Sequence, residues 1–238
     1  MSQEPKQKKP GTPEPQDVSS ISTVNMPDPS RLKEWAPKLS DAEFQACQVY
    51  IRELLRFNQK LNLISSGTVA QVDAVHVLDS IRAWDLIAPK VPVGSTVLDF
   101  GSGNGLPGLL AAALAPNRNF RLIDRDQRKI EFCKHVASSM KLTNVTFSCM
   151  DIAQVEKSTV KFAISRGFAS VTKSMLLTRP IFTVGGQFFM MKGEGWSLEL
   201  AELPPRMFSV WKSEMLGQYK IPGTPAEFVV LQCTKITD

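Results

Sequence analysis

The chain has 238 residues, of which 28 are Lys or Arg and 23 are Asp or Glu, so its formal net charge at pH 7 is +5. This length suits one well-buried α/β domain with an accessory element and is too short for two full-sized domains. No apolar run approaches the roughly twenty residues of a membrane span, and the N-terminus lacks the hydrophobic stretch of a secretory signal. We therefore expect a soluble, cytoplasmic protein with no membrane partner.

The four cysteines show no Cys-x-x-Cys spacing and lie near no cluster of histidines. This pattern indicates neither a zinc site nor a disulfide framework, so we expect reduced thiols and no bound metal.

Residues 1–29 contain six of the sixteen prolines and almost no large apolar side chains, which predicts a disordered tail. Three lysines against four acids give this tail a net charge of −1, so the remaining chain carries +6. A basic folded part is compatible with a polyanionic partner.

Residues 30–90 are expected to form an N-terminal helical region. Ser40-Asp41-Ala42-Glu43 has the form of a capping box that opens a helix. Apolar residues then recur at helical spacing, at Phe44, Cys47, Ile51, Leu54, Leu55 and Leu61. This stripe indicates a helix that lies on something larger, with a structural buttress as its plainest role. A second helix is predicted over 70–86, where His76 and Asp79 lie one turn apart.

Residues 91–238 alternate between strand-like and helix-like segments. The predicted strands are 96–100, 120–124, 145–149, 162–165 and 187–192, and the predicted helices are 106–114, 126–140 and 171–182. This alternation predicts a parallel sheet with crossover helices on both faces. Two late β runs, near 207–211 and 228–234, are separated by Pro222-Gly223-Thr224-Pro225, which fits an antiparallel hairpin at one edge.

A glycine-rich loop follows the first strand, because residues 98–108 read Leu-Asp-Phe-Gly-Ser-Gly-Asn-Gly-Leu-Pro-Gly. Such clustering behind a strand is typical of a nucleotide-type binding loop. Read from Gly103, the loop matches the G-x-G-x-x-G of dinucleotide enzymes, with Asp124 about twenty residues further on.

Three details favour S-adenosylmethionine over a dinucleotide, which stays an alternative. The strand runs directly into Gly101, so the natural register is Gly101-x-Gly103-x-Gly105. Asp99 offers a carboxylate, which suits a sulfonium and ammonium ligand better than a pyrophosphate. Pro107 has no N–H group to donate, which makes the turn a poorer anion cradle.

Further candidates follow the carboxyl ends of other strands, where open α/β sheets bind ligands. Asp124 is suited to the ribose hydroxyls of an adenosine, or else it only opens the next helix as Asp126 could. Ile152 and Ala153 would flank the adenine, with an ordinary loop as the alternative.

Arg166 and Lys192 are the candidate catalytic residues. The Arg166 fork follows the fourth strand and could hold a phosphate or a base edge, with a structural salt bridge as the alternative. Phe168 could stack on an extruded base or belong to the core. Lys192 ends the fifth strand and could reach the same pocket.

The choice of methyl acceptor is narrowed by the catalytic motifs that the chain lacks. Methylation of pyrimidine C5 needs a cysteine nucleophile, whereas Cys133 falls on an apolar helical face. Methylation of an exocyclic amine usually comes with a polar-Pro-Pro-aromatic tetrapeptide, whereas this chain has Ser165-Arg166-Gly167-Phe168. Guanine N7 already owns a free lone pair, so positioning alone could suffice.

Together these segments resemble the RsmG family, also called glucose-inhibited division protein B, the small-subunit (16S) rRNA guanine-N7 methyltransferases. The resemblance spans about residues 58–235. It is carried by Asn58-x-x-Leu61-Asn62-Leu63, His76-x-Leu78-Asp79-Ser80, Asp99-x-Gly101-Ser102-Gly103-x-Gly105-Leu106-Pro107-Gly108, Ser165-Arg166-x-Phe168-Ala169 and Lys192-Gly193. It implies cofactor contacts from Gly101 and Leu106, ribose contacts from Asp124, adenine contacts from Ile152 and Ala153, and an Arg166 that contacts the cofactor or the guanine.

Four positions depart from the family pattern. Val75 stands where the family usually has a basic residue, Asp151 where it has Arg, Ile64 where it has Thr and Gly167 where it has Ala. These departures bear on the RNA-facing side more than on the cofactor pocket.

We therefore expect a Rossmann-like S-adenosylmethionine-dependent methyltransferase fold, with a mainly parallel seven-stranded sheet, helices on both faces and an N-terminal helical extension. The expected cofactor-binding residues are Asp99, Gly101, Gly103, Gly105, Leu106, Asp124, Ile152, Ala153 and Arg166. The expected reaction of this monomer is methylation of guanine N7 in 16S rRNA, either free or in the assembling small subunit. Another RNA, protein or small-molecule acceptor is one alternative, and a non-catalytic RNA-binding protein with a vestigial pocket is another.

Overall fold

The computed structural model describes residues 26–238, so most of the tail predicted over residues 1–29 lies outside the described part. Before the first strand come α1 (Pro29–Trp35), α2 (Asp41–Leu61), η1 (Ser66–Gln71), η2 (Asp73–Leu78), α3 (Asp79–Ile87) and η3 (Ala88–Lys90). The strands are β1 (Thr96–Phe100), β2 (Asn119–Asp124), β3 (Val145–Cys149), β4 (Val160–Arg166), β5 (Phe182–Lys192), β6 (Trp211–Lys220) and β7 (Glu227–Lys235). Between them lie α4 (Gly108–Leu114), α5 (Gln127–Ser139), η4 (Ile152–Gln154), α6 (Val171–Thr178), α7 (Trp196–Ala201) and α8 (Pro205–Phe208). Within residues 26–238, no helix combines the length and apolarity needed to cross a membrane.

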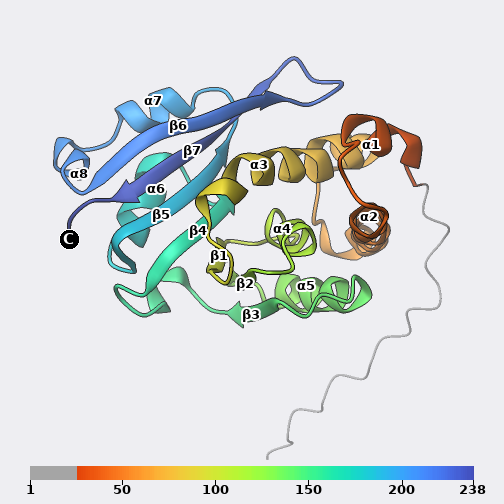
Figure 1. The fold of residues 1–238 in the computed structure, drawn as a ribbon, viewed down its shortest axis with the longest axis horizontal. Coiled ribbons are helices and arrows are strands. Elements are labelled where there is room, and N and C mark those ends of the chain that lie inside the picture. The colour runs from red at the N-terminus through yellow and green to blue at the C-terminus, as the bar shows by residue number, and fades with distance from the viewer. Residues whose placement is uncertain (1–25) are drawn as a thin grey trace, which may run out of the picture.

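The strands of the described chain form one seven-stranded sheet in the order β3-β2-β1-β4-β5-β7-β6 (Figure 1). Strands β1 to β5 run parallel, and β7 pairs antiparallel with both β5 and β6. The predicted parallel sheet with an antiparallel hairpin at one edge is thus confirmed. Because the chain continues from β1 to β2 on one side and returns to β4 on the other, the carboxyl ends of β1 and β4 flank a crevice of the kind that binds ligands in open α/β sheets.

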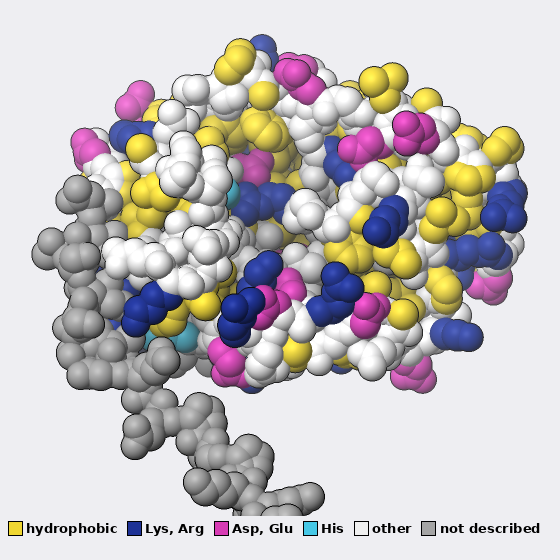
Figure 2. Space-filling model, turned by 180° about the vertical axis from the view of Figure 1, so that it is seen from behind, with side chains coloured by type: hydrophobic (Ala, Val, Ile, Leu, Met, Phe, Trp, Pro, Cys, Tyr) yellow, Lys and Arg dark blue, Asp and Glu magenta, His cyan; other side chains and the backbone are white. Residues whose placement is uncertain are grey.

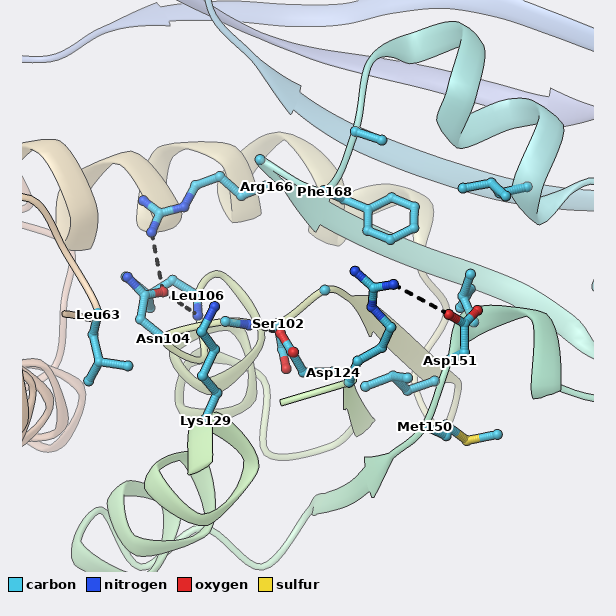
Figure 3. Close-up of a pocket in the computed structure, with 18 of the residues that line it drawn as sticks. Leu63, Ser102, Asn104, Leu106, Asp124, Lys129, Met150, Asp151, Arg166 and Phe168 are labelled. Atoms are coloured by element: carbon cyan, nitrogen blue, oxygen red, sulfur yellow. Dashed lines mark hydrogen bonds and ion pairs between the residues drawn. The ribbon is translucent and has the colours of Figure 1, made fainter. Parts of the chain in front are cut away.

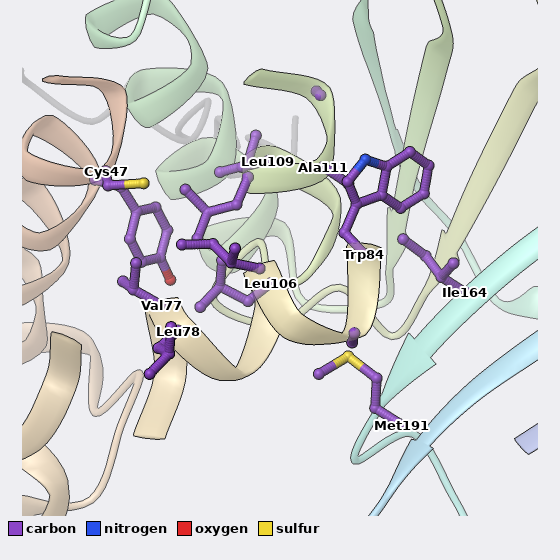
Figure 4. Close-up of a cluster of buried hydrophobic side chains, with 14 of the residues drawn as sticks. Cys47, Val77, Leu78, Trp84, Leu106, Leu109, Ala111, Ile164 and Met191 are labelled. Atoms are coloured by element: carbon purple, nitrogen blue, oxygen red, sulfur yellow. The ribbon is translucent and has the colours of Figure 1, made fainter. Parts of the chain in front are cut away.

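Helices cover both faces of the sheet, and each face has its own apolar core. On one face, α2, α3, α4 and α5 enclose the cluster shown in Figure 4, which contains Trp84, Leu109, Ile164 and Met191. On the other face, α6 and α7 pack over a second cluster that is rich in phenylalanine. The predicted two-faced helical cover is therefore confirmed.

Helix α2 begins with the predicted capping box. The N–H of Glu43 donates to Ser40 Oγ at 3.3 Å, and the N–H of Ser40 donates to Glu43 Oε2 at 2.8 Å. The predicted apolar stripe is buried from Phe44 to Leu55. Since this stripe packs on α4 and α5, α2 buttresses the helices that cover β2.

The helix predicted over 70–86 is not continuous. Its first part is the short turn η1 and the π-helix η2, and the regular helix α3 begins only at Asp79. Wide π turns often lie at functional sites. Here the wide turn carries His76 and directly precedes Asp79, the first residue of α3.

The prediction of a β run near 207–211 is wrong, because strand β6 begins only at Trp211. Pro205 occupies the first turn of α8, where its fixed φ and missing N–H favour a helix start. The buried side chains of Met207, Val210 and Trp211 explain the apolar pattern, because a short helix and the following strand share one core.

Candidate functional site

A cavity of about 670 Å³ opens at the carboxyl ends of β1, β2 and β4 (Figure 3). Its walls come from the glycine loop after β1, from the segments after β2, β3 and β4, and from α6 and the region before α3. The lining residues are Leu63, His76, Gly101, Ser102, Gly103, Asn104, Leu106, Ile123, Asp124, Arg125, Lys129, Met150, Asp151, Ile152, Arg166, Gly167, Phe168, Ala169, Lys173 and Leu177. Six predicted site residues, Gly101, Gly103, Leu106, Asp124, Ile152 and Arg166, thus share one cavity, whereas Asp99, Gly105, Ala153 and Lys192 are not among its lining.

Gly101 forms the cavity wall under the ring of Phe168. Its φ is +63°, which favours glycine, and a Cβ atom at this position would lie 2.8 Å from Phe168 Cδ2. The missing side chain therefore lets the Phe168 ring pack directly on the loop at this part of the cavity wall.

Asp99 lies behind the glycine loop. Its side chain is fully buried, and Oδ2 accepts the N–H of Gly108 at 2.9 Å. Burial raises the pKa of this carboxyl to about 7, although the Gly108 N–H and the charge of Arg166 oppose that rise. Oδ1 has no hydrogen-bond partner. The carboxyl therefore anchors the start of α4 to β1 and keeps one free acceptor.

Asp124 ends β2 and lines the cavity as predicted. Its Oδ2 accepts the N–H of Gly103 at 2.8 Å, and its Oδ1 accepts the N–H of Asp126 at 2.9 Å. The carboxylate therefore ties the glycine loop to the start of α5 and still has lone pairs for a ligand.

Beyond Asp124, the cavity is bounded by the segment after β3. Met150 and Ile152 provide apolar lining, while Asp151 caps η4 by accepting the N–H of Ala153 at 2.9 Å. Asp151 also pairs with Arg125 at 3.7 Å. This end of the cavity combines an apolar surface with polar groups, which suits a flat heterocycle.

Arg166 ends β4 at the opposite end of the cavity from Asp151 (Figure 3). Its Nη1 donates to Asp79 Oδ2 at 3.2 Å, and its Nη2 donates to Asn104 Oδ1 at 3.4 Å. The side chain is 18% exposed, so the charge is largely buried but still open to the cavity. Arg166 thus forms a salt bridge with Asp79, which the sequence left as the alternative role, and it also lines the cavity.

Asn104 was not predicted from the sequence, although it lies inside the glycine loop. Its Oδ1 accepts the N–H of Leu106 at 3.2 Å as well as Arg166, and its backbone carbonyl accepts the hydroxyl of buried Tyr50 at 2.9 Å. A polar residue between two loop glycines was the available signal. Tyr50 gave none, because it belongs to the apolar side of α2.

Lys192 does not reach the cavity wall. Its Nζ donates to the carbonyl of Ala169 at 2.7 Å and to Glu199 Oε2 at 2.8 Å. The segment after Arg166 is therefore held against α7 by this lysine. The structure does not show the expected contact of Lys192 with the cavity. The side chain instead contacts Ala169 and Glu199, because β5 ends beside α7.

His76 lines the cavity as a neutral side chain. Its Nε2 lies 3.0 Å from Thr68 Oγ1, and burial, with a contribution from the charge of Arg166, lowers its pKa to about 3. The Thr68 hydroxyl donates to the carbonyl of Ser65 at 3.0 Å, so it is free to accept from the imidazole. An uncharged imidazole at this position does not repel a cationic ligand.

No thiol faces the cavity among the described residues. Cys133 lies behind the glycine loop with Sγ 3.6 Å from the carbonyl of Gly103, and burial raises its pKa. No group of His, Cys, Asp and Glu side chains within residues 26–238 could hold a metal ion. The polar groups that line the cavity include loop backbone, the carboxylates of Asp124 and Asp151, and the cationic side chains of Arg125, Lys129, Arg166 and Lys173.

The GidB family model, described as rRNA small subunit methyltransferase G, matches residues 43–218, which include α2, the glycine loop and Arg166. The chain belongs to this family. Within the methyltransferase G family, the Ribosomal RNA small subunit methyltransferase G 3 of Bdellovibrio bacteriovorus is 39% identical over 206 residues, which cover 87% of this chain and 93% of that protein. The Ribosomal RNA small subunit methyltransferase G of Chromohalobacter salexigens is 30% identical over 187 residues, which cover 75% of this chain and 82% of that protein.

Two solved structures share the fold of this methyltransferase G chain. The [4+2]-cyclase SpnF aligns with a TM-score of 0.54 at 14% identity, over 77% of this chain and 96% of its own. The YcgJ protein from Bacillus subtilis aligns with a TM-score of 0.51 at 12% identity, over 66% of this chain and 100% of its own. One of these proteins is a cyclase, so the sheet architecture alone does not determine the reaction. The reaction has to be inferred from the side chains in the cavity.

Proposed function

We propose that this protein transfers the methyl group of S-adenosylmethionine to N7 of a guanine in small-subunit (16S) rRNA. The observation that carries the proposal is the shared cavity of the Gly101 loop, Asp124 and Arg166. The family membership adds the rRNA substrate, because its relatives bear the name of small-subunit rRNA methyltransferases.

The cavity residues fit the cofactor. The backbone at Gly101 and Gly103 lets a ligand approach closely, Asp124 keeps lone pairs for ribose hydroxyls, and Ile152 offers an apolar surface for adenine. Bound S-adenosylmethionine supplies an electrophilic methyl group on a sulfonium centre. We propose that Asp99, Gly105 and Ala153 support these contacts from behind the wall, since none of them lines the cavity.

Guanine N7 suits the side chains that are present. Its lone pair needs no base to expose it, and neutral His76 and buried Cys133 offer neither an acid nor a thiolate nucleophile to the cavity. Arg166 uses two of its five N–H groups on Asp79 and Asn104, so others are left for a phosphate or a base edge. Catalysis would then be in-line positioning of the acceptor and the sulfonium.

The cavity rim favours a polyanion. Arg125, Lys129 and Lys173 line it together with Asp124 and Asp151, and Figure 2 shows Lys and Arg side chains, with Asp and Glu side chains among them, around a hollow in this face. Phosphate contacts of this kind supply much of the affinity of proteins for nucleic acids. We propose that the protein acts as a monomer in the cytoplasm, with residues 30–90 as a helical extension that buttresses the core over 91–238.

Methyl transfer can be measured directly. S-adenosylmethionine with a labelled methyl group is incubated with the protein and a substrate. The substrate is small subunits, or free 16S rRNA, from cells that lack this protein. We expect label in N7-methylguanine at a single position, located by cleavage at the modified base. Label in another nucleotide, in protein or in a small molecule would contradict the proposed acceptor. Failure of the protein to bind S-adenosylmethionine in calorimetry would support the vestigial-pocket alternative.

A further inference from the structure

One buried carboxylate joins Arg166 to a strand far along the chain. Asp79, the first residue of α3, accepts Arg166 Nη1 on Oδ2 at 3.2 Å and the hydroxyl of Tyr219 on Oδ1 at 2.7 Å. We propose that Asp79 and Tyr219 are positioning residues that fix the Arg166 guanidinium at the cavity edge. This inference rests on the proposed function for the role of Arg166, but the geometry itself can be tested without a methyl acceptor.

The burial of Asp79 explains why both partners are needed. The residue is 5% exposed, and a carboxylate removed from water is costly unless its oxygens are paired. Burial raises the pKa of Asp79, whereas the charge of Arg166 and the hydrogen bond from Tyr219 lower it. The tyrosine therefore helps to keep the negative charge that holds the arginine.

Tyr219 lies on β6 and packs against the neighbouring strand. Its ring stacks on Phe228 of the paired strand β7, with ring centroids 6.0 Å apart and an angle of 20° between the rings. Burial and the neighbouring Asp79 both raise the pKa of its hydroxyl, so the hydroxyl stays protonated and can only donate to the carboxylate. Tyr219 also lies one residue beyond the region that the family model matches, 43–218, so its role is not assigned by that match.

The other side of the guanidinium is also fixed. Arg166 Nη2 donates to Asn104 Oδ1, which accepts the N–H of Leu106 as well. Figure 3 shows Arg166 directly above Asn104, with the cavity extending from this pair toward Asp151. The arginine is thus clamped between α3 and the glycine loop, so a change at Tyr219 should alter its orientation without removing any group from the cavity wall.

The inference is tested by NMR of the arginine side chains in the full chain without ligands. The Arg166 Nε–Hε signal is assigned by its loss in Arg166→Lys. We expect Tyr219→Phe and Asp79→Asn to shift this signal toward that of a solvated arginine and to speed its exchange with water. Lys220→Gln, which removes an exposed neighbour on the same strand, serves as the matched control and should leave the signal unchanged. An unchanged Arg166 signal in Tyr219→Phe overturns the proposal.

A pH titration of the wild-type protein keeps the test decisive if a variant does not fold. In the wild type, the Arg166 signal should shift toward that of a solvated arginine as the pH falls through the raised pKa of Asp79. Where Tyr219→Phe folds, this transition should lie at higher pH, because the hydrogen bond from Tyr219 lowers the pKa of Asp79. Asp99 and His76 also act on Arg166 electrostatically, but neither touches Tyr219, so their transitions should stay in place. A titration that does not loosen Arg166 overturns the proposal.

Kinetics separate a positioning role from a structural one. Because a hydrogen bond to a charged group contributes about tenfold or more to an equilibrium, we expect Tyr219→Phe to lower kcat by about tenfold at pH 7 with little change in KM for S-adenosylmethionine. The acid side of its pH profile should move to higher pH. An equal loss at all pH values with a raised KM would indicate a merely structural tyrosine. If the wild-type protein methylates no rRNA while the NMR effect is present, the proposed function fails and the positioning stands.

Discussion

Phe168 lies directly over Gly101, so that a Cβ atom on the glycine would come 2.8 Å from the ring carbon Cδ2. The ring also packs on Phe100, with centroids 6.2 Å apart, which gives it an apolar support on the sheet. The segment after β4 and the glycine loop after β1 therefore fit together only because position 101 has no side chain.

We expect Gly101→Ala to weaken the binding of S-adenosylmethionine. The added methyl group meets Phe168, and the φ of +63° is unfavourable for alanine. Because overpacking costs about 1–3 kcal/mol, the affinity should fall by about tenfold or more. Isothermal titration calorimetry measures this loss.

Gly167→Ala is the matched control for this prediction. Gly167 has the same φ of +63° and also lines the cavity, but a Cβ atom there would have no neighbour within 4 Å. It should therefore show the backbone strain without the clash and lose less affinity. Equal losses in the two variants would contradict the role given to Phe168.

The buried carboxyl of Asp99 should give the protein a measurable pH dependence of stability. In the unfolded chain it titrates near its ordinary pKa of 3.8, whereas burial raises the folded value to about 7. Between these values the folded state holds a proton that the unfolded state has released, so the free energy of unfolding falls as the pH rises. Asp99→Asn, which stays neutral, should lack this loss.

Urea denaturation from pH 4 to 8 measures the effect. Relative to wild type, Asp99→Asn should gain stability as the pH rises from about 4 to 7 and keep a constant difference above that. The Asn oxygen can still accept the N–H of Gly108, so the loop keeps its anchor. Parallel profiles for the two proteins would show that Asp99 is ionised in the folded state.

Much of the site could be predicted because parallel strands bring their carboxyl ends to one edge of the sheet. Asp124 and Arg166 end two strands, the glycine loop and Ile152 follow two others, and all of them share the cavity. Sequence spacing could also predict the α2 capping box, because both partners lie within one helical turn. These features depend on local pattern and strand order alone.

Contacts between distant segments could not be predicted in this way. Tyr219 lies 140 residues from Asp79, and nothing near either residue indicates their hydrogen bond. Lys192 follows the expected strand, but its direction is set by Glu199 on α7, a helix that the sequence pattern did not predict. Such contacts depend on how the edge hairpin and the helices pack, which no single-segment pattern encodes.

Arg166→Ala should abolish or severely reduce methyl transfer. A single preorganised donor in an active site is worth about a hundredfold or more in rate, and Arg166 is the guanidinium held at the cavity edge by Asp79 and Asn104. Arg166→Lys keeps the charge but loses the fork, so it should restore little activity. Near-wild-type turnover of either variant on small subunits would refute the assignment.

Arg166→Ala should also destabilise the fold, because Asp79 would lose its charged partner. Breaking a buried ion pair typically costs about 3–5 kcal/mol, which urea denaturation would detect. Cofactor binding measured beside stability shows whether the lost activity reflects chemistry or unfolding. A variant that is stable and binds S-adenosylmethionine but does not transfer the methyl group isolates the catalytic contribution.

Cys133→Ala should retain methyl transfer. N7 of guanine attacks the methyl group with its own lone pair, so the proposed reaction forms no bond between the protein and the base. The Cys133 thiol lies behind the glycine loop, 3.6 Å from the carbonyl of Gly103, and burial raises its pKa, so it stays protonated. Its removal should cost about 1 kcal/mol of stability through a small cavity. A folded, cofactor-binding Cys133→Ala protein without activity, together with a covalent RNA adduct of the wild type in mass spectrometry, would instead establish a nucleophilic mechanism and exclude the N7 reaction.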